Sequence, residues 1–465
     1  MSRTQLLGAA SAAVLSCFTA GAHASSVING GGSTLAQFDY IAEFSAFNGS
    51  TTGATFGSYW EAGSGSGQNA FLYDDLTCDI NKVSGANGGD CTGSTTSGPG
   101  TGGGVAGNTV VYGASDATLD NAEPPFASTD ASQLAFWASE SFGQALSGGL
   151  IQLPSMGIGV SFPVNNANVT TNGALSLSDK DLCEVFSGGY TDFSQITDAV
   201  SLSKVKGKFA PGPITVTYRS DGSGTSFILL DHLAAVCTAA DTKAGVTFTA
   251  TTNFVSVFGG TAPANFKGEK GSSGIAGFME PATGSQPDTI GYLSPDFTSV
   301  VPTSFATVNG KASTLVVASV LNKVTPELPT ATNITLGLGH ATKGYYLTAP
   351  TTVTEGANPA NWVPLVQVTA AGYPIVGYTT YDFAQCYKDP TITASVISFL
   401  TQHYTAGSAE QTDQADNGFV LIANSGAAGF GKGITKRFLT NNGTKANPAW
   451  NLNFGNTTVC KGIGR

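Results

Sequence analysis

Four short segments rich in glycine, serine and threonine carry the groups that could bind a small anion. They lie at residues 30–35, 63–67, 115–116 and 219–225. Glycine lets the backbone turn tightly and approach a ligand closely, and the unpaired N–H groups at a helix start favour a negatively charged ligand. Arg219 adds a guanidinium, the hydroxyls add donors, and Asp116 adds a carboxylate. Together these groups predict a cage for a tetrahedral oxyanion.

The patterns around these segments predict alternating strands and helices. An extended run at 26–29 leads into the first glycine segment, and apolar residues at helical spacing follow over 35–44, with Ser33 or Thr34 at the N-cap. The same order recurs in a strand at 214–219, a glycine turn and a helix over 226–236. Such alternation is typical of α/β proteins.

Shorter patterns predict the remaining elements that would hold these segments in place. The segment 63–67 is expected to be a bare loop, and the polar tract 79–108 a surface insertion without a core of its own. Ser178, with Asp181 three residues later, is expected to open a helix. The other predicted elements are strands at 110–113, 149–154 and 159–164, and helices at 178–186 and 391–404.

The first 24 residues predict a secretory signal peptide. An apolar run at 6–20 is followed by Ala22-His23-Ala24, a small-x-small cleavage site. No apolar run reaches the roughly 20 residues of a membrane-spanning helix. We therefore expect a periplasmic or secreted protein, and the choice between the two stays open. A lipoprotein anchored through Cys17 is the alternative.

Composition and charge narrow the classes of protein further. Charged residues make up 11% of the chain and hydrophobic residues 41%, which indicates a folded globule rather than a disordered chain. The net charge of −11 argues against a nucleic-acid partner, which would require a basic surface. An anion must therefore be bound by local hydrogen-bond donors.

The cysteine count predicts disulfides. Removal of the signal peptide leaves an even number, which in an exported protein indicates disulfide bonding. No Cys-x-x-Cys sequence occurs, so we expect no metal. Sequence alone does not select the pairing, but proximity along the chain favours Cys78–Cys91, Cys183–Cys237 and Cys386–Cys460.

Several segments resemble the DING proteins, which are relatives of the phosphate-binding subunit of the phosphate ABC transporter. The first segment runs from Val27 to Leu35, with Val27 where the eponymous motif has aspartate. The likeness extends from Ile28 to Arg465, interrupted by the insertion. The other segments that carry it are Gly63-Ser64-Gly65, Ala114-Ser115-Asp116, and residues 182–188, 218–225, 372–377 and 459–465.

The resemblance implies a two-lobed, type II periplasmic-binding-protein fold of the α/β class, with the ligand cleft between the lobes. Lobe 1 would comprise 25–155 and 371–465, and lobe 2 would comprise 156–300, while 301–370 stays unassigned. The resemblance also supports the disulfides Cys183–Cys237 and Cys386–Cys460. Cys78 and Cys91 lie at the insertion and would be particular to this chain.

The resemblance further implies high-affinity binding of inorganic phosphate for uptake or scavenging by a monomer without a cofactor, with a phosphate ABC permease as partner. Asp116 would accept a hydrogen bond from the proton of the phosphate. Phosphate near neutral pH keeps at least one proton and sulfate keeps none, so a fixed carboxylate would favour the first and repel the second. The implied donors are Thr34, Leu35, Ser64, Arg219, Ser223, Gly224 and Thr225.

Two other classes of protein stay open. A secreted phosphatase or phosphodiesterase could use the same cage, but no Gly-x-Ser-x-Gly or His-Glu-x-x-His sequence occurs. The mature chain offers few general bases, since its histidines are His232, His340 and His403. A matrix or adhesion protein would fit the abundance of Gly, Thr and Asn. We expect a binding protein rather than an enzyme.

Overall fold

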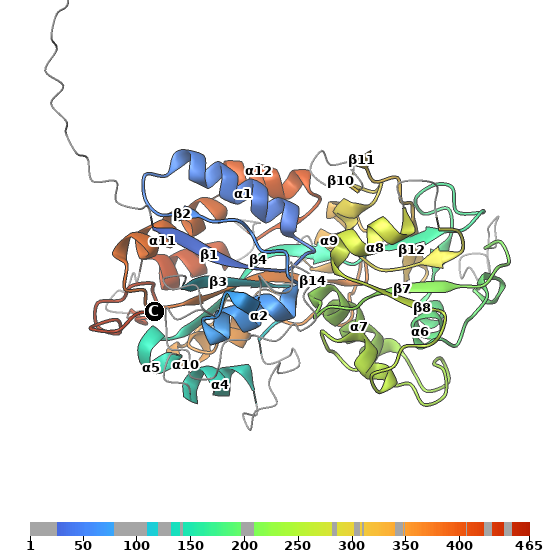
Figure 1. The fold of residues 1–465 in the computed structure, drawn as a ribbon, viewed down its shortest axis with the longest axis horizontal. Helices are drawn as coiled ribbons and strands as arrows, with labels where there is room; N and C mark the ends of the chain where they lie inside the picture. The colour runs from blue at the N-terminus through green and yellow to red at the C-terminus, as the bar shows by residue number, and fades with distance from the viewer. Residues whose placement is uncertain are drawn as a thin grey trace, which may run out of the picture.

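A computed structural model describes residues 26–78, 109–119, 132–139, 143–196, 209–280, 286–301, 307–308, 311–339, 347, 349–405, 407–422, 430–440 and 449–465. The signal peptide, the insertion, Cys91 and His340 lie outside these residues. The described chain forms two α/β lobes that lie side by side, each built around its own sheet (Figure 1). The predicted two-lobed α/β fold is therefore confirmed.

The sheet of lobe 1 joins strands that are far apart in the sequence. Its order is β15-β4-β14-β3-β1-β2, and β14 lies between β3 and β4, antiparallel to both. Every residue of β14 is buried, which places this strand at the centre of the lobe. The strands are β1 (Val27–Gly32), β2 (Thr55–Phe56), β3 (Val110–Ser115), β4 (Leu150–Gly159), β14 (Val376–Ala384) and β15 (Val420–Leu421).

Helices cover both faces of this sheet (Figure 1). One face carries α1 (Gln37–Ser50), α11 (Pro390–His403) and α12 (Ala409–Asp416). The other carries α2 (Ser64–Tyr73), α4 (Gln133–Ser139), α5 (Gln144–Ser147) and α10 (Val353–Gly356). Further elements of the lobe are α9 (Ala331–Gly337), η5 (Pro359–Trp362), α13 (Phe430–Ile434) and the π-helical η6 (Thr435–Leu439).

The sheet of lobe 2 has the order β13-β12-β5-β9-β7-β8, and β6 also pairs with β12. Its strands are β5 (Phe162–Asn165), β6 (Ser176–Leu177), β7 (Thr215–Arg219), β8 (Phe266–Glu269), β9 (Thr289–Ile290), β12 (Val317–Asn322) and β13 (Thr325–Glu327). A separate two-stranded sheet is formed by β10 (Thr307–Val308) and β11 (Lys311–Ala312). The helices are α6 (Asp179–Ser187), α7 (Gly224–Val236), α8 (Gly271–Met279), η2 (Phe193–Gln195), η3 (Phe254–Phe258) and η4 (Pro295–Phe297).

Most of the predicted elements are confirmed. The helix predicted at 178–186 is α6, and Ser178 and Asp181 form a reciprocal capping box at its start. The predicted strand and helix around Arg219 are β7 and α7, although α7 begins at Gly224 because Ser223 caps it. The region 301–370 is divided, since β12 and β13 join the sheet of lobe 2 while α9 and η5 contact β4 of lobe 1.

Three local predictions are wrong. The expected loop at 63–67 is the start of α2, capped by Gly63. The strand predicted at 149–154 continues to Gly159, because a bulge at residue 155 lets β4 pair with β14 beyond Pro154. The helix predicted from residue 35, with Ser33 or Thr34 at its N-cap, begins at Gln37 with Ala36 at the N-cap. The Ser33 hydroxyl instead accepts hydrogen bonds from the N–H groups of residues 35 and 36, in the turn before the helix.

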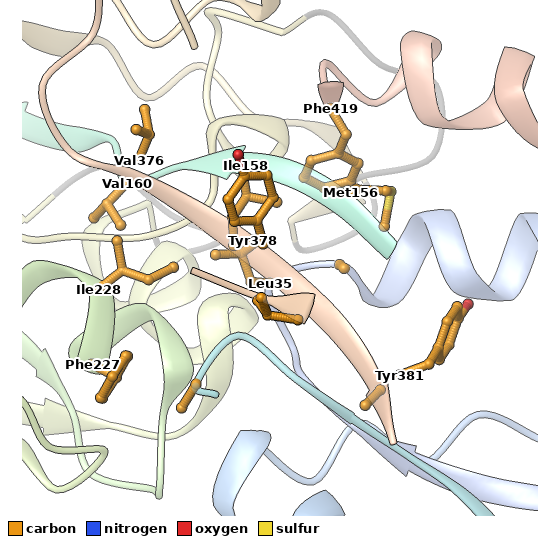
Figure 2. Packing of buried hydrophobic residues seen from close by; sticks show 14 of the residues in the cluster. Leu35, Met156, Ile158, Val160, Phe227, Ile228, Val376, Tyr378, Tyr381 and Phe419 are labelled. Carbon is orange, nitrogen blue, oxygen red and sulfur yellow. The ribbon is translucent and has the colours of Figure 1, made fainter. Parts of the chain in front are cut away.

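The hydrophobic core continues from one lobe into the other. Ile228, from α7 of lobe 2, lies near Val160 and Val376 at the junction (Figure 2). On another side, Phe38 of α1 packs on a separate apolar cluster of lobe 2, where its ring centroid lies 5.0 Å from that of Phe297. The two lobes are therefore in contact through both of these apolar clusters.

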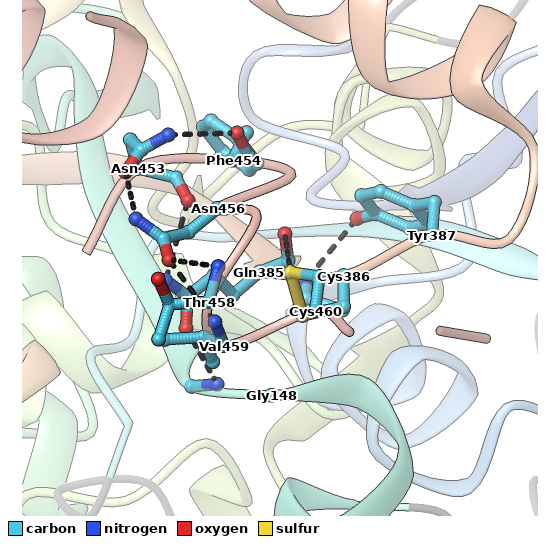
Figure 3. Close-up of a disulfide and its surroundings, with 12 residues drawn as sticks. Gly148, Gln385, Cys386, Tyr387, Asn453, Phe454, Asn456, Thr458, Val459 and Cys460 are labelled. Carbon is cyan, nitrogen blue, oxygen red and sulfur yellow. Dashed lines mark hydrogen bonds between the residues drawn. A yellow bond between two sulfur atoms is a disulfide. The ribbon is translucent and has the colours of Figure 1, made fainter. Parts of the chain in front are cut away.

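Two of the predicted disulfides are confirmed. Cys183–Cys237 ties α6 to the end of α7, and Cys386–Cys460 ties the end of β14 to the C-terminal segment (Figure 3). The pairing of Cys78 with Cys91 stays a prediction. Of the helices within the described part of the chain, none combines the length and the apolar character that crossing a membrane requires.

Candidate functional site

The residues predicted to bind an anion are all buried where the two lobes meet. Lobe 1 contributes Asp116 after β3, and lobe 2 contributes the start of α7. A Cβ atom on Gly224 would lie 2.5 Å from Cβ of Asp116 and 2.6 Å from Oγ of Ser64, so the backbone of α7 packs directly on lobe 1. The buried set is Thr34, Leu35, Ser64, Asp116, Arg219, Ser223, Gly224 and Thr225.

Asp116 is surrounded by hydroxyl donors. Ser33 Oγ donates to its Oδ1 over 2.5 Å, and Ser64 Oγ lies 3.3 Å from its Oδ2 and 3.1 Å from its backbone N. Burial raises the pKa of Asp116 to about 6, although hydrogen bonds from Ser33, Thr379 and Ser64 and the charge of Arg219 oppose this rise. Near neutral pH the group is therefore an ionised hydrogen-bond acceptor in a dry environment.

Arg219 ends β7 and is held by a neighbouring carboxylate. Its Nε donates to Oδ1 of Asp221 over 2.7 Å, and its Nη2 donates to Oδ2. Burial alone would raise the pKa of Asp221, but the guanidinium and the backbone N–H of Gly271 hold it below its usual value. The remaining nitrogen, Nη1, lies 3.4 Å from Oγ1 of Thr225. The ion pair between Asp221 and Arg219 thus fixes the guanidinium so that its Nη1 lies at the start of α7.

The starts of α7, α2 and α1 lie at this junction. The Ser223 side chain caps α7 by accepting from the N–H of Ser226, which leaves the N–H groups of Gly224 and Thr225 in the first turn. At the start of α2, the N–H of Gly65 donates across the junction to the Gly222 carbonyl over 3.0 Å. Helix starts with such donors favour an anion.

The start of α1 differs in part from its expected role, which is to donate hydrogen bonds to an anion. The N–H of Leu35 donates to Ser33 Oγ over 3.1 Å, so this donor already has a partner in the chain. Thr34 Oγ1 accepts from the N–H of Ser272 in α8 over 3.2 Å, which links the lobes. Thr34 therefore contributes a contact between lobes besides any bond to a ligand.

Sequence reasoning missed four residues of this site. Ser33 and Asp221 stood within the recognised segments, but their partners Asp116 and Arg219 become visible only in the fold. No pattern in the sequence indicates Thr379 on β14 or Tyr40 on α1, because an isolated threonine or tyrosine in an apolar element is typical of a core position. Both are fully buried behind Asp116.

The donor set suits an anion rather than a cation. It consists of backbone N–H groups, hydroxyls and one guanidinium, with Asp221 occupied by Arg219. Across the described ranges, no group of three or more His, Cys, Asp or Glu side chains could hold a metal ion.

Comparisons with known proteins agree with this architecture. A family model described as a PBP superfamily domain matches residues 19–402. Alkaline phosphatase L from Pseudomonas aeruginosa is 32% identical over 96% of this chain and 95% of its own length. A phosphate-binding protein from an unknown prokaryotic organism is 30% identical over 94% of this chain and 99% of its own.

Among solved structures, a high-affinity periplasmic phosphate-binding protein (PfluDING) bound with phosphate is 31% identical, with a TM-score of 0.67. The match covers 94% of this chain and 99% of that one. This chain therefore belongs to the PBP superfamily and, within it, to the DING proteins.

Proposed function

We propose that the protein is an exported receptor that captures inorganic phosphate between its two lobes. One observation carries the proposal: the carboxyl group of Asp116 is buried opposite Arg219 and the N-terminus of α7. A cage of donors with a single acceptor matches an anion that still carries a proton. Relatives whose names or titles describe phosphate binding support this function.

In this proposal the eight residues have distinct roles. Nη1 of Arg219 and the first turn of α7 donate from lobe 2, through Ser223, Gly224 and Thr225. Thr34 and Ser64 would donate from lobe 1 through their hydroxyls, the N–H of Leu35 would have to exchange Ser33 Oγ for the anion, and Asp116 would accept from the proton of the anion. Because the donors come from both lobes, the bound anion stabilises the closed arrangement. A phosphate ABC permease would receive the anion outside the cytoplasm.

The test is isothermal titration of the mature protein with phosphate and with sulfate. We expect one phosphate per chain and much weaker binding of sulfate. Asp116→Asn should lose much of this discrimination, because a neutral amide can donate to sulfate. Asp192→Asn, which changes a carboxylate that caps η2 in lobe 2, is the control and should behave as the wild type. Equal binding of the two anions by the wild type would refute the role of Asp116.

A phosphomonoesterase is the second candidate, and the relatives named alkaline phosphatase L favour it. The pair of Ser33 Oγ and Asp116 Oδ1, 2.5 Å apart, has the composition of an activated nucleophile. However, Ser33 Oγ also accepts from the N–H groups of Leu35 and Ala36, over 3.1 and 3.4 Å. These bonds occupy its lone pairs and weaken it as a nucleophile, so we favour binding without chemistry.

Hydrolysis of p-nitrophenyl phosphate separates the two candidates. The binding proposal expects no turnover above the rate of buffer alone. Turnover that is lost in both Ser33→Ala and Ser223→Ala would instead establish a hydrolase that uses the same cage.

A further inference from the structure

Lobe 1 contains a cavity that lies away from the junction of the lobes. Its volume is about 410 Å³, which falls within the range of small-molecule sites. Leu150, at the start of β4, lines the cavity and pairs with Ala384 of β14. Ser115, the residue before Asp116, pairs with Thr380 of the same strand. These two positions on β14 are separated by about 13 Å of extended strand, so the cavity is not part of the anion site.

Aromatic side chains from three segments line this cavity. They are Trp362 of η5, Phe438 of η6 and Trp450 of the C-terminal segment. The ring centroids of Trp362 and Phe438 lie 4.7 Å apart at an interplanar angle of 70°. A Cβ atom on Gly356 of α10 would lie 2.4 Å from Cζ3 of Trp450, so the backbone of α10 packs directly on that indole. These contacts hold the aromatic wall in place.

Three polar side chains of the wall already have partners within the chain. Trp362 Nε1 donates to a backbone carbonyl of α10 over 2.9 Å, and Gln152 Oε1 accepts from a backbone N–H that follows β3 over 2.8 Å. Gln385, next to the disulfide in Figure 3, accepts from the N–H of Gly149 over 3.1 Å. Among the described residues that line the cavity, none has an ionisable side chain. The cavity therefore offers an apolar surface without a countercharge.

The mouth of the cavity is also apolar. Val353 of α10 and Val459 of the C-terminal segment line the cavity and are 46% and 36% exposed. Trp362 is only 1% exposed, so the cavity extends from these valines toward the core of the lobe. A ligand that covered the valines would remove further apolar surface from water, which favours its binding.

We propose that this cavity binds one small, uncharged aromatic molecule. An apolar cavity of about 150 Å³ holds one benzene ring, so a volume of about 410 Å³ suits a ligand of two or three rings. Flat rings pack against the indoles of Trp362 and Trp450 through offset or edge contacts. The inference does not depend on the proposed function, since it concerns a different site.

The charges around the cavity argue against an ionised ligand. A charged molecule would lose its hydration without gaining an ionic partner in the wall. The guanidinium of Arg437 lies 3.3 Å from the ring centroid of Trp450, so this indole already has a cation on it and a cationic ligand would be repelled. The net charge of −11 opposes an anionic ligand.

The experiment uses N-phenyl-1-naphthylamine, an uncharged aromatic probe whose fluorescence rises in apolar surroundings. Titration of the mature protein near neutral pH should give a saturable rise that corresponds to one probe per chain. 1-Naphthol should displace the probe, whereas naphthalene-1-sulfonate at the same concentration should not, because its charge has no partner in the wall. Phosphate should leave the signal unchanged.

Two substitutions test whether the probe occupies this cavity. Val353→Glu places a charge at the mouth and should weaken probe binding by about tenfold. Ala357→Trp fills the space with an apolar side chain and should abolish binding. Val324→Glu and Ala244→Trp make the same changes in lobe 2 and should behave as the wild type. All four positions are exposed, so none of these substitutions removes a core side chain.

Several outcomes would overturn the inference. A wild type without saturable binding would do so, and so would wild-type affinity for the probe in both Val353→Glu and Ala357→Trp. Equal displacement by 1-naphthol and the sulfonate would refute the preference for an uncharged ligand, and displacement by phosphate would place the probe between the lobes instead. A wild type that sediments as a dimer, with Val353→Glu as a monomer, would assign the apolar mouth to a second copy of the chain rather than to a small molecule.

Discussion

Replacement of Gly224 by alanine should prevent the lobes from closing while each lobe stays folded. The added Cβ would lie 2.5 Å from Cβ and 2.7 Å from the carbonyl carbon of Asp116, and 2.6 Å from Oγ of Ser64. Carbon atoms in contact are normally about 3.5–4.0 Å apart, so the lobes must separate locally by about 1 Å. Gly224 does not have a positive φ, so alanine adds no backbone strain.

The loss of affinity follows from this separation. Hydrogen bonds of about 2.9 Å would be stretched beyond about 3.5 Å on one side of the anion. If two bonds to a charged ligand are lost, at about 1.5–3 kcal/mol each, the affinity for phosphate should fall about 10²- to 10⁴-fold. Titration calorimetry measures this loss directly. Small-angle scattering should show that phosphate compacts the wild type and leaves Gly224→Ala open.

Gly65→Ala is the control across the same junction. Its added Cβ would lie 3.4 Å from Cα of Gly222, which is an ordinary van der Waals contact. This variant should bind and compact as the wild type does. If Gly224→Ala bound phosphate as tightly as Gly65→Ala, the anion would not require the closed contact between α7 and lobe 1, and the steric reasoning would be refuted.

Three further variants test the surroundings of the site. Asp221→Ala leaves the buried guanidinium of Arg219 without its partner, so chemical denaturation should show a loss of about 3–5 kcal/mol; an unchanged midpoint would contradict the buried pair. Joint replacement of Cys386 and Cys460 by serine should lower the free energy of unfolding by about 2–5 kcal/mol in the same assay. The affinity for phosphate should stay unchanged, since the disulfide lies beyond the far end of β14. Weaker binding would show that the disulfide is coupled to the site. Asp296→Asn should strengthen phosphate binding severalfold at pH 8.5 but not at pH 5. Burial raises the pKa of Asp296 to about 7, so its charge opposes closure above that pH and is already absent below it; an equal effect at both pH values would rule out this charge.

The sequence alone predicts the segments that contact the candidate site, but it does not predict the residues that pack behind them. A glycine turn before a helix is a local sequence pattern. Such patterns allow Asp116, Arg219 and the start of α7 to be assigned to one anion-binding site. The hydrogen bond from Thr379 to the Ser115 carbonyl, next to Asp116, arises from strand register between residues 264 apart, and no local pattern encodes it. The segment Gly63-Ser64-Gly65-Ser66-Gly67 predicts a loop because it has poor helix propensity, but tertiary contacts override this propensity and the segment forms the start of α2.

The central position of β14 has a consequence for the order in which the lobes assemble. Within the described residues, the strands of lobe 2 all lie between residues 162 and 327, so they leave the ribosome before β14, residues 376–384, does. The strands β3 and β4 must wait for β14 to fill the gap between them. Pairings at such sequence distance are slow to form, so lobe 2 can fold first while lobe 1 remains unstructured. Refolding of the full chain should accordingly be a two-stage process that ends with the insertion of β14.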